Sequence, residues 1–327
     1  IYFLSSDHLK ENLEYLLDFV QSPFFTDENV EKEKGIIEEE IKMYDDDPYS
    51  YLDDKIRYNG FKKNPIRYSV AGEIKDIRAI TKEDLYECYK TFYHPSNMFL
   101  VLTGNFDPNE IIKIVSQNQE KKHFDKLDKI VIKKTKEPDE VNKEYEEKEM
   151  NVEVPKISYG IKIPLKNISY EPRKRDIYLS IIFNSLFGST SRFHEKAKEN
   201  GLLLSYASIS TSYTDSHLYI TISADTEKAE ELVELIKETL NDFEIDDDDF
   251  ENKKKLFLSN YLYTLEDVDA LNARIVNDLI IYGKHETDYD IILEGITKQE
   301  LGQFIKQLNF DNVSIAVIKP FKQGRNM

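Results

Sequence analysis

TDENVEKEKGIIEEEIKMYDDD, residues 26–47, is the strongest helix signal in the chain, and the rest of the sequence can be read outward from it. Thr26 is a suitable N-cap, acidic residues follow it at the positive end of the helix dipole, and Pro48 marks the exit. Aliphatic residues recur at three- and four-residue spacing, so the stretch predicts one long amphipathic helix.

Two glutamates fall on the apolar side of this helix. At about 100° per residue, Glu40 lies within about 20° of Glu33, in the middle of the apolar stripe. A buried carboxylate is costly unless it is paired, hydrogen-bonded or bound to a cation. We therefore expect both to face inward and to meet a metal ion, or a Lys or Arg in a structural ion pair. If Glu40 instead reached bulk solvent at the edge of the stripe, burial would cost nothing and would give no reason to expect a cation there.

The composition indicates a large, acidic, globular protein. A chain of 327 residues has room for two domains with sizeable cores. The net charge of −18 argues against a nucleic acid or an anionic membrane as the main partner, and is compatible with peptides. No run has the length of a transmembrane helix and no signal peptide is visible, so we expect a cytoplasmic protein. The single cysteine, Cys88, excludes an intramolecular disulfide and is expected to be buried in a helix.

Strand and helix patterns alternate along the whole chain. Strands are predicted at residues 2–5, 97–103, 145–152, 157–163, 203–212, 217–223 and 312–318. Helices are predicted at residues 9–21, 26–47, 49–59, 82–92, 108–116, 173–186, 192–200, 227–243, 248–262, 267–282 and 298–308. We expect the third and fourth strands to pair, and the fifth and sixth to form a hairpin. This order predicts an α+β fold with helices packed on one face of an antiparallel or mixed sheet.

The two halves of the chain contain the same succession of motifs. ITKEDL at residues 80–85 recurs as ITKQEL at 296–301, and each leads through a helix into an apolar strand that begins with Asn. At nearly the same offset, ENLEYLLDFVQ and YFLSS have counterparts in EKAEELVELIK and YITIS. The chain therefore holds two copies of one domain. We assign residues 1–118 to the first copy, 119–150 to a charged, solvated linker and 151–327 to the second.

The two copies differ where the two acids lie. When NVEKEKGII is aligned with DFENKKKLF, Lys253 stands opposite Glu33 and Asn260 opposite Glu40. Acids needed only for the fold would more easily occur in both copies, so the difference favours a function confined to the first. Residues from about 145 to 218 have no counterpart in the first half. We therefore expect the first domain to lack its N-terminal part.

These motifs resemble those of one peptidase family. VEKEKGIIEEEI, YHPSNMFLVLTGNFD and the duplicated domain are similar to the pitrilysin/insulinase family of zinc metallopeptidases, the inverzincins. LDFVQSPFFTDENVEKEKGIIEEEIKMYDDDP is especially similar to the YmfH-type branch of that family in Gram-positive bacteria. The resemblance implies two homologous domains of the LuxS/metallohydrolase-like fold, with zinc on the first and the second closing over a peptide.

The resemblance also implies roles for individual residues. In the family an H-x-x-E-H helix supplies two histidine ligands and a glutamate base, and a later helix supplies a glutamate as the third zinc ligand. Glu40 matches that third ligand, and Glu33 matches the acid that supports the site without binding the metal itself. Such a site leaves a coordination position for water, whose pKa the zinc lowers for attack on a peptide carbonyl.

The sequence departs from the family because it contains no H-x-x-E-H, and none of its six histidines has ligand spacing to another. We expect that motif in the missing part of the first domain. The family also uses an Arg and a Tyr of the second domain to contact the substrate. In the matching stretch, AKENGLLLSY, Lys198 is the nearest cation and Tyr206 is the candidate phenol, which could polarise a carbonyl. The alternative for Tyr206 is an ordinary strand aromatic.

The resemblance implies a zinc-dependent metalloendopeptidase, or the C-terminal portion of one, that cleaves short or unfolded peptides in a two-domain chamber. Members of the family bind peptides by adding them as a strand to a sheet edge. Without the H-x-x-E-H motif the chain as given is expected to be inactive alone. One alternative is a non-catalytic homologue that serves as a partner subunit or forms a homodimer. Another is a peptide-binding scaffold that holds no zinc.

Overall fold

The computed structural model describes residues 7–127 and 130–321 of the chain. They belong to two compact units of discontinuous segments. Unit 1 comprises Ile1–Glu39, Glu73–Lys133 and Tyr261–Thr287, and unit 2 comprises Glu40–Gly72, Lys134–Asn260 and Asp288–Met327. Two long helices, α2 (Asp27–Asp46) and α10 (Asp247–Glu266), contribute residues to both units. The strand expected at residues 2–5 lies outside the described residues.

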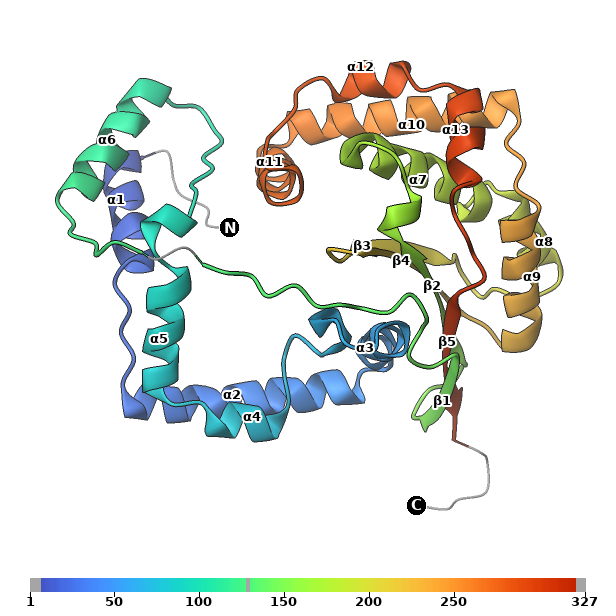
Figure 1. Cartoon of the computed structure of the whole chain (residues 1–327), viewed down its shortest axis with the longest axis horizontal. Coiled ribbons are helices and arrows are strands. Elements are labelled where there is room, and N and C mark those ends of the chain that lie inside the picture. The colour runs from blue at the N-terminus through green and yellow to red at the C-terminus, as the bar shows by residue number, and fades with distance from the viewer. Residues whose placement is uncertain (1–6, 128–129, 322–327) are drawn as a thin grey trace. The chain divides into compact units, whose positions relative to one another are not determined.

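Unit 2 is built on a five-stranded mixed sheet in the order β1-β5-β2-β4-β3 (Figure 1). Its strands are β1 (Tyr145–Met150), β2 (Lys156–Pro164), β3 (Ser208–Tyr213), β4 (His217–Asp225) and β5 (Val313–Pro320). The hairpin prediction is confirmed, because β3 pairs antiparallel with β4. The predicted pairing of β1 with β2 is wrong: β5 lies between them, parallel to β1 and antiparallel to β2. The apolar sequence of β5 suits a central strand, whereas the charged YEEKEM of β1 suits an edge.

The main core of unit 2 lies between one face of this sheet and a layer of helices. The helices that supply buried residues to it include α7 (Pro172–Phe187), α8 (Arg192–Glu199), α9 (Ala229–Asn241) and α13 (Lys298–Ile305). From the sheet, Ile157 and Ile161 of β2 and Ile220 of β4 point into this core, each at most 1% exposed. α7 is buried on most of its surface, as expected for a helix that is apolar nearly all round.

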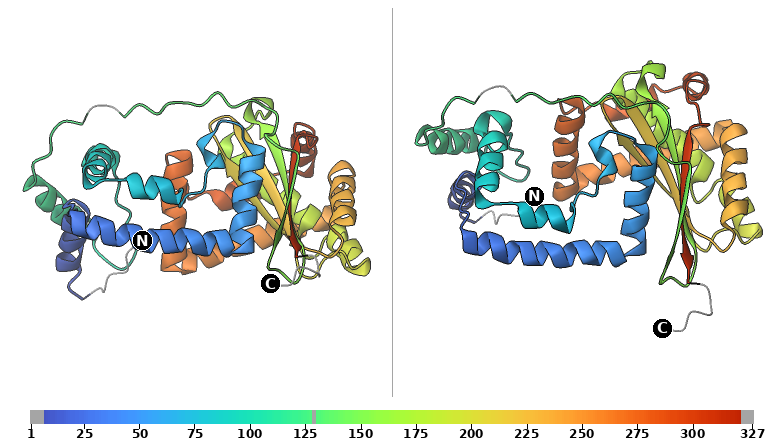
Figure 2. Two further views of the ribbon diagram at one scale, coloured as in Figure 1. Left: turned by 90° about the horizontal axis from the view of Figure 1, so that it is seen from below. Right: turned by 60° about the horizontal axis from the view of Figure 1, so that its bottom comes forward.

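The opposite face of the sheet is also covered, by α3 (Pro48–Gly60), so helices lie on both faces (Figure 2). Tyr219 of β4 is 1% exposed there, and its hydroxyl donates a hydrogen bond of 2.7 Å to the carbonyl of Ile56. The ring passes between two glycines. A Cβ on Gly60 would lie 2.6 Å from the ring, and a Cβ on Gly160 would lie 2.0 Å from the hydroxyl oxygen. Only a residue without a side chain fits at either position.

A buried ion pair fixes part of the predicted linker to this face. Lys162 of β2 and Glu137 both have fully buried side chains, with 2.7 Å between Nζ and Oε1. The Glu137 carboxylate also accepts hydrogen bonds from the backbone N–H groups of Lys62, Lys63 and Asn64 at 2.7–2.8 Å. Burial by itself raises the pKa of Glu137, but these hydrogen bonds outweigh it and lower the pKa to about 2. The expectation that residues 119–150 form a solvated tether is therefore wrong around Glu137.

The described residues of unit 1 form helices joined by loops, without a strand. Apart from its part of α2 and α10, its α-helices are α1 (Leu9–Val20), α4 (Ile74–Ala79), α5 (Lys82–Phe92), α6 (Pro108–Glu120) and α11 (Val268–Tyr282). A small core joins α1 to α6 through Leu13, Ile111 and Ile114. Thr81 begins α5 with a capping box to Asp84. The same device begins α13 of unit 2 at its counterpart in the repeat, Thr297.

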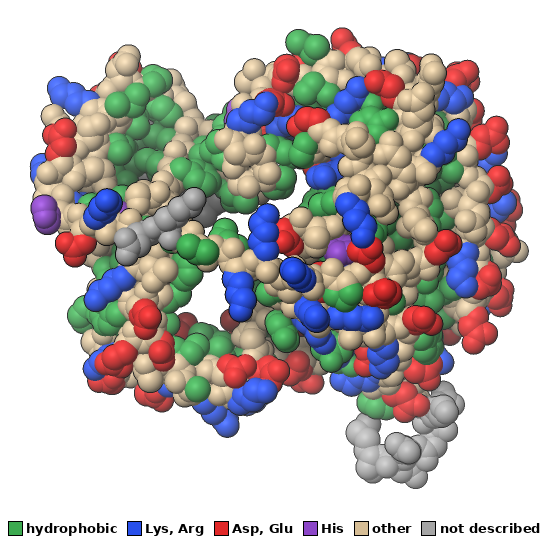
Figure 3. Space-filling view, viewed as in Figure 1, with side chains coloured by type: hydrophobic (Ala, Val, Ile, Leu, Met, Phe, Trp, Pro, Cys, Tyr) green, Lys and Arg blue, Asp and Glu red, His purple; other side chains and the backbone are tan. Residues whose placement is uncertain are grey.

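The apolar segment 97–103 does not form the predicted strand. A strand needs a neighbour for its backbone groups, and no strand occurs among the described residues of unit 1. Phe99 and Leu100 are therefore 56% and 43% exposed, and hydrophobic side chains show on the surface of this unit (Figure 3). Cys88 on α5 is exposed as well, so its predicted burial is wrong. None of the described helices is long and apolar enough to cross a membrane.

The helices predicted from the sequence are confirmed, with ends that differ by a few residues. Several short elements were not predicted: α4, α12 (Tyr289–Glu294) and the 3₁₀ turns Pro65–Arg67, Pro95–Asn97 and Leu165–Asn167. Elements of three to six residues are too short to show a helical repeat of apolar residues, so the sequence gives them no periodic signal.

Candidate functional site

α2 begins with a side-chain cap and ends just before the cap of the next helix. Thr26 Oγ1 accepts a hydrogen bond from the Asn29 N–H at 3.2 Å, and Asn29 Oδ1 accepts one from the Thr26 N–H at 2.8 Å. At the other end Asp47 caps the next helix by accepting from the Ser50 N–H at 2.8 Å, with Pro48 in its first turn. The helix that carries both candidate acids is therefore confirmed in position and length.

Only one flank of the apolar stripe of α2 is covered. Ile41 is 5% exposed, whereas Ile36 and Met43, on the opposite flank, are 52% and 60% exposed. Glu33 and Glu40 lie between the two flanks and are exposed. The expectation that both carboxylates are buried is wrong, because the described residues leave this flank uncovered. The argument from burial for a cation at Glu40 is removed, and the resemblance in sequence remains.

Some of the other charges of α2 are paired, whereas those of the two candidate acids are not. Glu38 forms a two-point ion pair with Arg78, with both N–O distances at 2.8 Å. Within the described residues, neither Glu33 nor Glu40 lies within ion-pair distance of a Lys or Arg. Glu40 instead accepts a hydrogen bond of 2.8 Å from the hydroxyl of Tyr44, and this bond raises the pKa of Tyr44. The remaining lone pairs of the Glu40 carboxylate are open to a cation.

The described residues do not form a zinc site by themselves. Among them, no three His, Cys, Asp or Glu side chains lie close enough together to hold a metal ion. His94 contacts the carbonyl of Asp125 at 2.8 Å through Nε2, and His285 contacts Asp278 at 2.8 Å through Nδ1. His217 is 1% exposed in unit 2. If the Glu40 carboxylate of α2 binds zinc, the other ligands have to come from outside the described residues.

Lys198 and Tyr206 lie on unit 2, at the end of α8 and in the segment that follows. Lys198 is exposed in the last turn of the helix. Tyr206 is 65% exposed, and its ring stacks on that of His194, with 4.8 Å between the ring centroids and 21° between the planes. The structure does not bring these two side chains together with Glu40 by any hydrogen bond or ion pair among its described residues. Their roles stay predictions.

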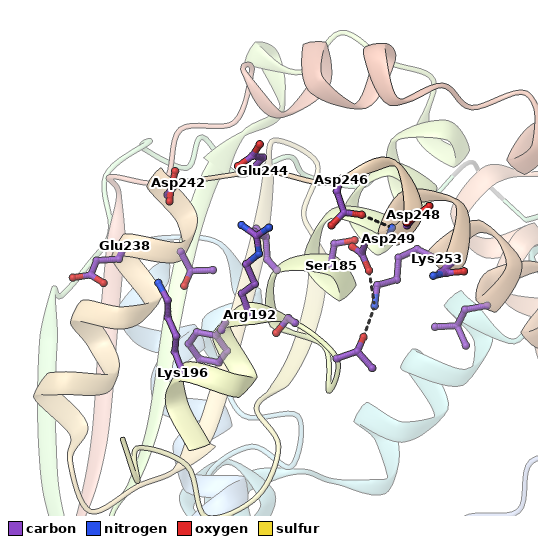
Figure 4. A pocket seen from close by; sticks show the side chains of 17 residues that line it. Ser185, Arg192, Lys196, Glu238, Asp242, Glu244, Asp246, Asp248, Asp249 and Lys253 are labelled. Carbon is purple, nitrogen blue, oxygen red and sulfur yellow. Dashed lines mark hydrogen bonds and ion pairs between the residues drawn. The ribbon is translucent and has the colours of Figure 1, made fainter. Parts of the chain in front are cut away.

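Sequence reasoning missed a cavity of about 850 Å³ in unit 2, between α7, α8 and the start of α10 (Figure 4). Lys253 of α10 lines it and is 5% exposed. The available signal was the repeat, which sets Lys253 opposite Glu33 and so marks a difference in charge between the two copies. Because the sequence alone does not show what packs around Lys253, it could not reveal a cavity.

Two models of one family match the chain. A model described as "Insulinase (Peptidase family M16)" matches residues 1–73, the segment that contains α2. A model described as "Peptidase M16 inactive domain" matches residues 79–257, which is more than half of the chain.

Individual relatives agree with this match. The chain is 39% identical over 240 residues to the zinc protease YmfH of Bacillus subtilis, covering 73% of this chain and 56% of YmfH. It therefore spans little more than half the length of that relative. It is 22% identical to YmfF of the same organism, named a "probable inactive metalloprotease", over 93% of this chain and 72% of YmfF.

The structure is similar to the crystal structure of an M16-like peptidase from Alicyclobacillus acidocaldarius. The TM-score is 0.88 at 30% sequence identity, and the match covers 96% of this chain and 75% of that one. The α+β fold class predicted from the sequence is confirmed.

Proposed function

This chain belongs to peptidase family M16, and on that basis we propose that it is part of a zinc-dependent endopeptidase that cleaves short or unfolded peptides between two homologous domains. Residues 1–118 would belong to the metal-binding domain and residues 151–327 to the domain without ligands. The net charge of −18 favours neutral or basic peptides as substrates and disfavours nucleic acid or an anionic membrane as a partner. We place this activity in the cytoplasm.

The proposal depends on the position, exposure and hydrogen-bond partner of Glu40. It lies in the segment matched by the insulinase model, it is exposed, and its contact is a tyrosine hydroxyl rather than a cation. We assign it as the carboxylate ligand of the zinc. The hydrogen bond from Tyr44 would hold one carboxylate oxygen in place, as a neighbouring donor does for many metal ligands. Glu33 would support the site from the preceding turns without binding the metal.

Unit 2 would contribute to the handling of the peptide. Lys198 and Tyr206 are both exposed, so both are free to approach a peptide carbonyl. A lysine ammonium and a phenol hydroxyl can each donate a hydrogen bond to a carbonyl oxygen as it gains negative charge. The stacking of Tyr206 on His194 limits how far its ring can turn.

A second candidate is a non-catalytic homologue that acts as a partner subunit or a peptide-binding scaffold. The absence of a three-ligand group among the described residues favours it. The likeness to YmfF also favours it, because the name of that protein describes a probable inactive metalloprotease.

Zinc content separates the two candidates. We would measure it by atomic emission on the product of the whole gene and on the 327-residue chain, each as wild type, as Glu40→Gln and as Glu39→Gln. Glu39 is a control because it is an exposed glutamate of the same helix that points about 100° away from its neighbour Glu40. Stoichiometric zinc and peptide hydrolysis that are lost only in Glu40→Gln would support the endopeptidase. Zinc retained by Glu40→Gln would overturn the ligand assignment, and a gene product without zinc would favour the non-catalytic homologue.

A further inference from the structure

The cavity of unit 2 has a buried lysine with unused hydrogen-bonding capacity. Lys253 is 5% exposed, and its Nζ donates to the hydroxyl of Thr190 at 3.0 Å. Oδ1 of Asp249, one turn earlier on α10, forms an ion pair with Nζ at 3.6 Å, a distance that is too long for a hydrogen bond. An ammonium group has three donors, and a buried charge is unfavourable unless its donors are satisfied. The Lys253 ammonium therefore keeps donor capacity for a further acceptor inside the cavity.

Two walls of the cavity carry opposite charges. On one wall Arg192 and Lys196 extend from α8 toward the connection between α9 and α10 (Figure 4). The facing wall carries carboxylates along that connection and the first turn of α10: Asp242, Glu244, Asp246 and Asp248. Within the described part of the chain, neither Arg192 nor Lys196 forms an ion pair across the cavity. The cations of α8 and the carboxylates of the facing wall therefore face the same space, where both can contact a ligand.

The buried lysine and the two oppositely charged walls together restrict the class of ligand that the cavity can bind. Carboxylates outnumber cations on the lining, so a polyanion such as a phosphorylated compound would be repelled. A simple cation would satisfy the carboxylates and leave Lys253 as it is. A molecule that carries one positive and one negative end satisfies both walls, and 850 Å³ lies within the usual range of about 300–1,000 Å³ for small-molecule sites.

We propose that this cavity binds the zwitterionic form of a short peptide. The terminal carboxylate accepts hydrogen bonds from Lys253 and Arg192, and the terminal ammonium lies against the carboxylates of the facing wall. In the repeat, Lys253 stands opposite Glu33, so this copy carries a cation where the first carries an acid. The second copy would then hold peptides by their ends and perform no chemistry on them.

The site needs no metal, so its test is independent of the zinc assignment. We would titrate the 327-residue chain with trialanine by isothermal calorimetry, in parallel with N-acetyl-trialanine and trialanine amide. Each blocked peptide lacks one of the two charges and keeps the rest of the molecule. We expect a Kd of about 1 mM or tighter for trialanine. Each block should weaken binding about tenfold or more, because a charge-assisted hydrogen bond is lost.

Two variants place the binding in this cavity. Lys253→Met and Arg192→Gln should each weaken trialanine binding about tenfold by the same reasoning. Lys237→Gln is the matched control: Lys237 is on α9 and pairs with Glu234 of the same helix, and it does not line the cavity. Arg192 is exposed, so Arg192→Gln decides the question if replacing the buried lysine prevents folding.

Three outcomes would overturn the proposal. The first is the absence of trialanine binding at concentrations about tenfold above the expected Kd. The second is binding that Arg192→Gln weakens no more than Lys237→Gln does. The third is binding that is insensitive to one of the two blocks, since this would indicate a site for a single charge. Loss of zinc from the protein would leave all of these results unchanged.

Discussion

Replacing Glu137 by Gln removes the charge of a buried carboxylate that connects its own segment to two other parts of the chain. The carboxylate accepts hydrogen bonds from Lys162 of β2 and from the backbone N–H groups of the loop after α3, at Lys62, Lys63 and Asn64. The pKa of Glu137 is lowered from 4.5 to about 2. Because one pKa unit corresponds to about 1.4 kcal/mol, this carboxylate contributes about 3 kcal/mol to stability at neutral pH. This figure already includes the interaction with Lys162, and it agrees with the cost of about 3–5 kcal/mol for removing one partner of a buried ion pair.

The pH dependence follows from the same shift. The native carboxyl group binds its proton more weakly than the unfolded one, so its contribution is complete above about pH 4.5 and is lost as the pH falls toward about 2. We would measure urea unfolding by circular dichroism at pH 7 and pH 3. Wild type should lose this contribution on acidification, and Glu137→Gln should show a smaller acid-induced loss because part of the contribution is already gone.

Two controls make this test specific. Glu234→Gln removes the partner of Lys237, in a pair whose side chains are 67% and 43% exposed, and should cost less than about 0.5 kcal/mol. The double variant Glu137→Gln with Lys162→Met removes the unpaired ammonium and keeps an amide oxygen for the backbone N–H groups of the loop, so it should recover part of the stability that Glu137→Gln loses. The reasoning is refuted if Glu137→Gln costs no more than Glu234→Gln, or if the two proteins lose equal stability at pH 3.

Two further predictions concern the same face of the sheet. Gly160→Ala places a Cβ 2.0 Å from the Tyr219 hydroxyl and should destabilise unit 2 by about 3 kcal/mol or more; a thermal midpoint within about 1 °C of wild type would contradict the packing. His217 should titrate below its ordinary pKa of 6.5, because burial and the nearby Lys162 charge outweigh the hydrogen bond to Asp139. The lowered pKa means that His217 supports the fold above about pH 6.5 and less so below it, and an imidazole NMR titration with a midpoint at or above 6.5 would show that the ring is not buried as described.

The elements that were predicted correctly from the sequence alone are marked by local sequence features. α2, α5 and α13 each begin at a side-chain cap, and the β3–β4 hairpin joins two adjacent strands. Such features depend on residues a few positions apart, so local chemistry is enough to locate them. At the repeat of ITKEDL and ITKQEL, the structure confirms the same local feature in both copies, a capping box at Thr81 and at Thr297.

The features that were missed depend on distant partners. Whether segment 97–103 becomes a strand depends on a neighbouring strand, and β1 pairs with β5 from the far end of the chain. Glu137 lies in a run of charges, and only the fold shows that Lys162 and three backbone N–H groups meet it in the interior. The exposure of Glu40 likewise depends on what covers α2. A helical period gives the direction of a side chain and not the identity of its neighbours.

The position of β5 in the sheet has a consequence for how the protein is made. Tyr145 of β1 pairs with Ile315 of β5, and Ile157 of β2 pairs with Val317, so one strand from late in the chain separates two that are synthesised much earlier. While the ribosome is still producing the intervening residues, β1 has no partner and β2 has a bare edge. Such edges invite pairing with other chains, and long-range pairings close slowly. Nascent chains stalled before β5 are therefore the species most exposed to aggregation and most in need of a chaperone.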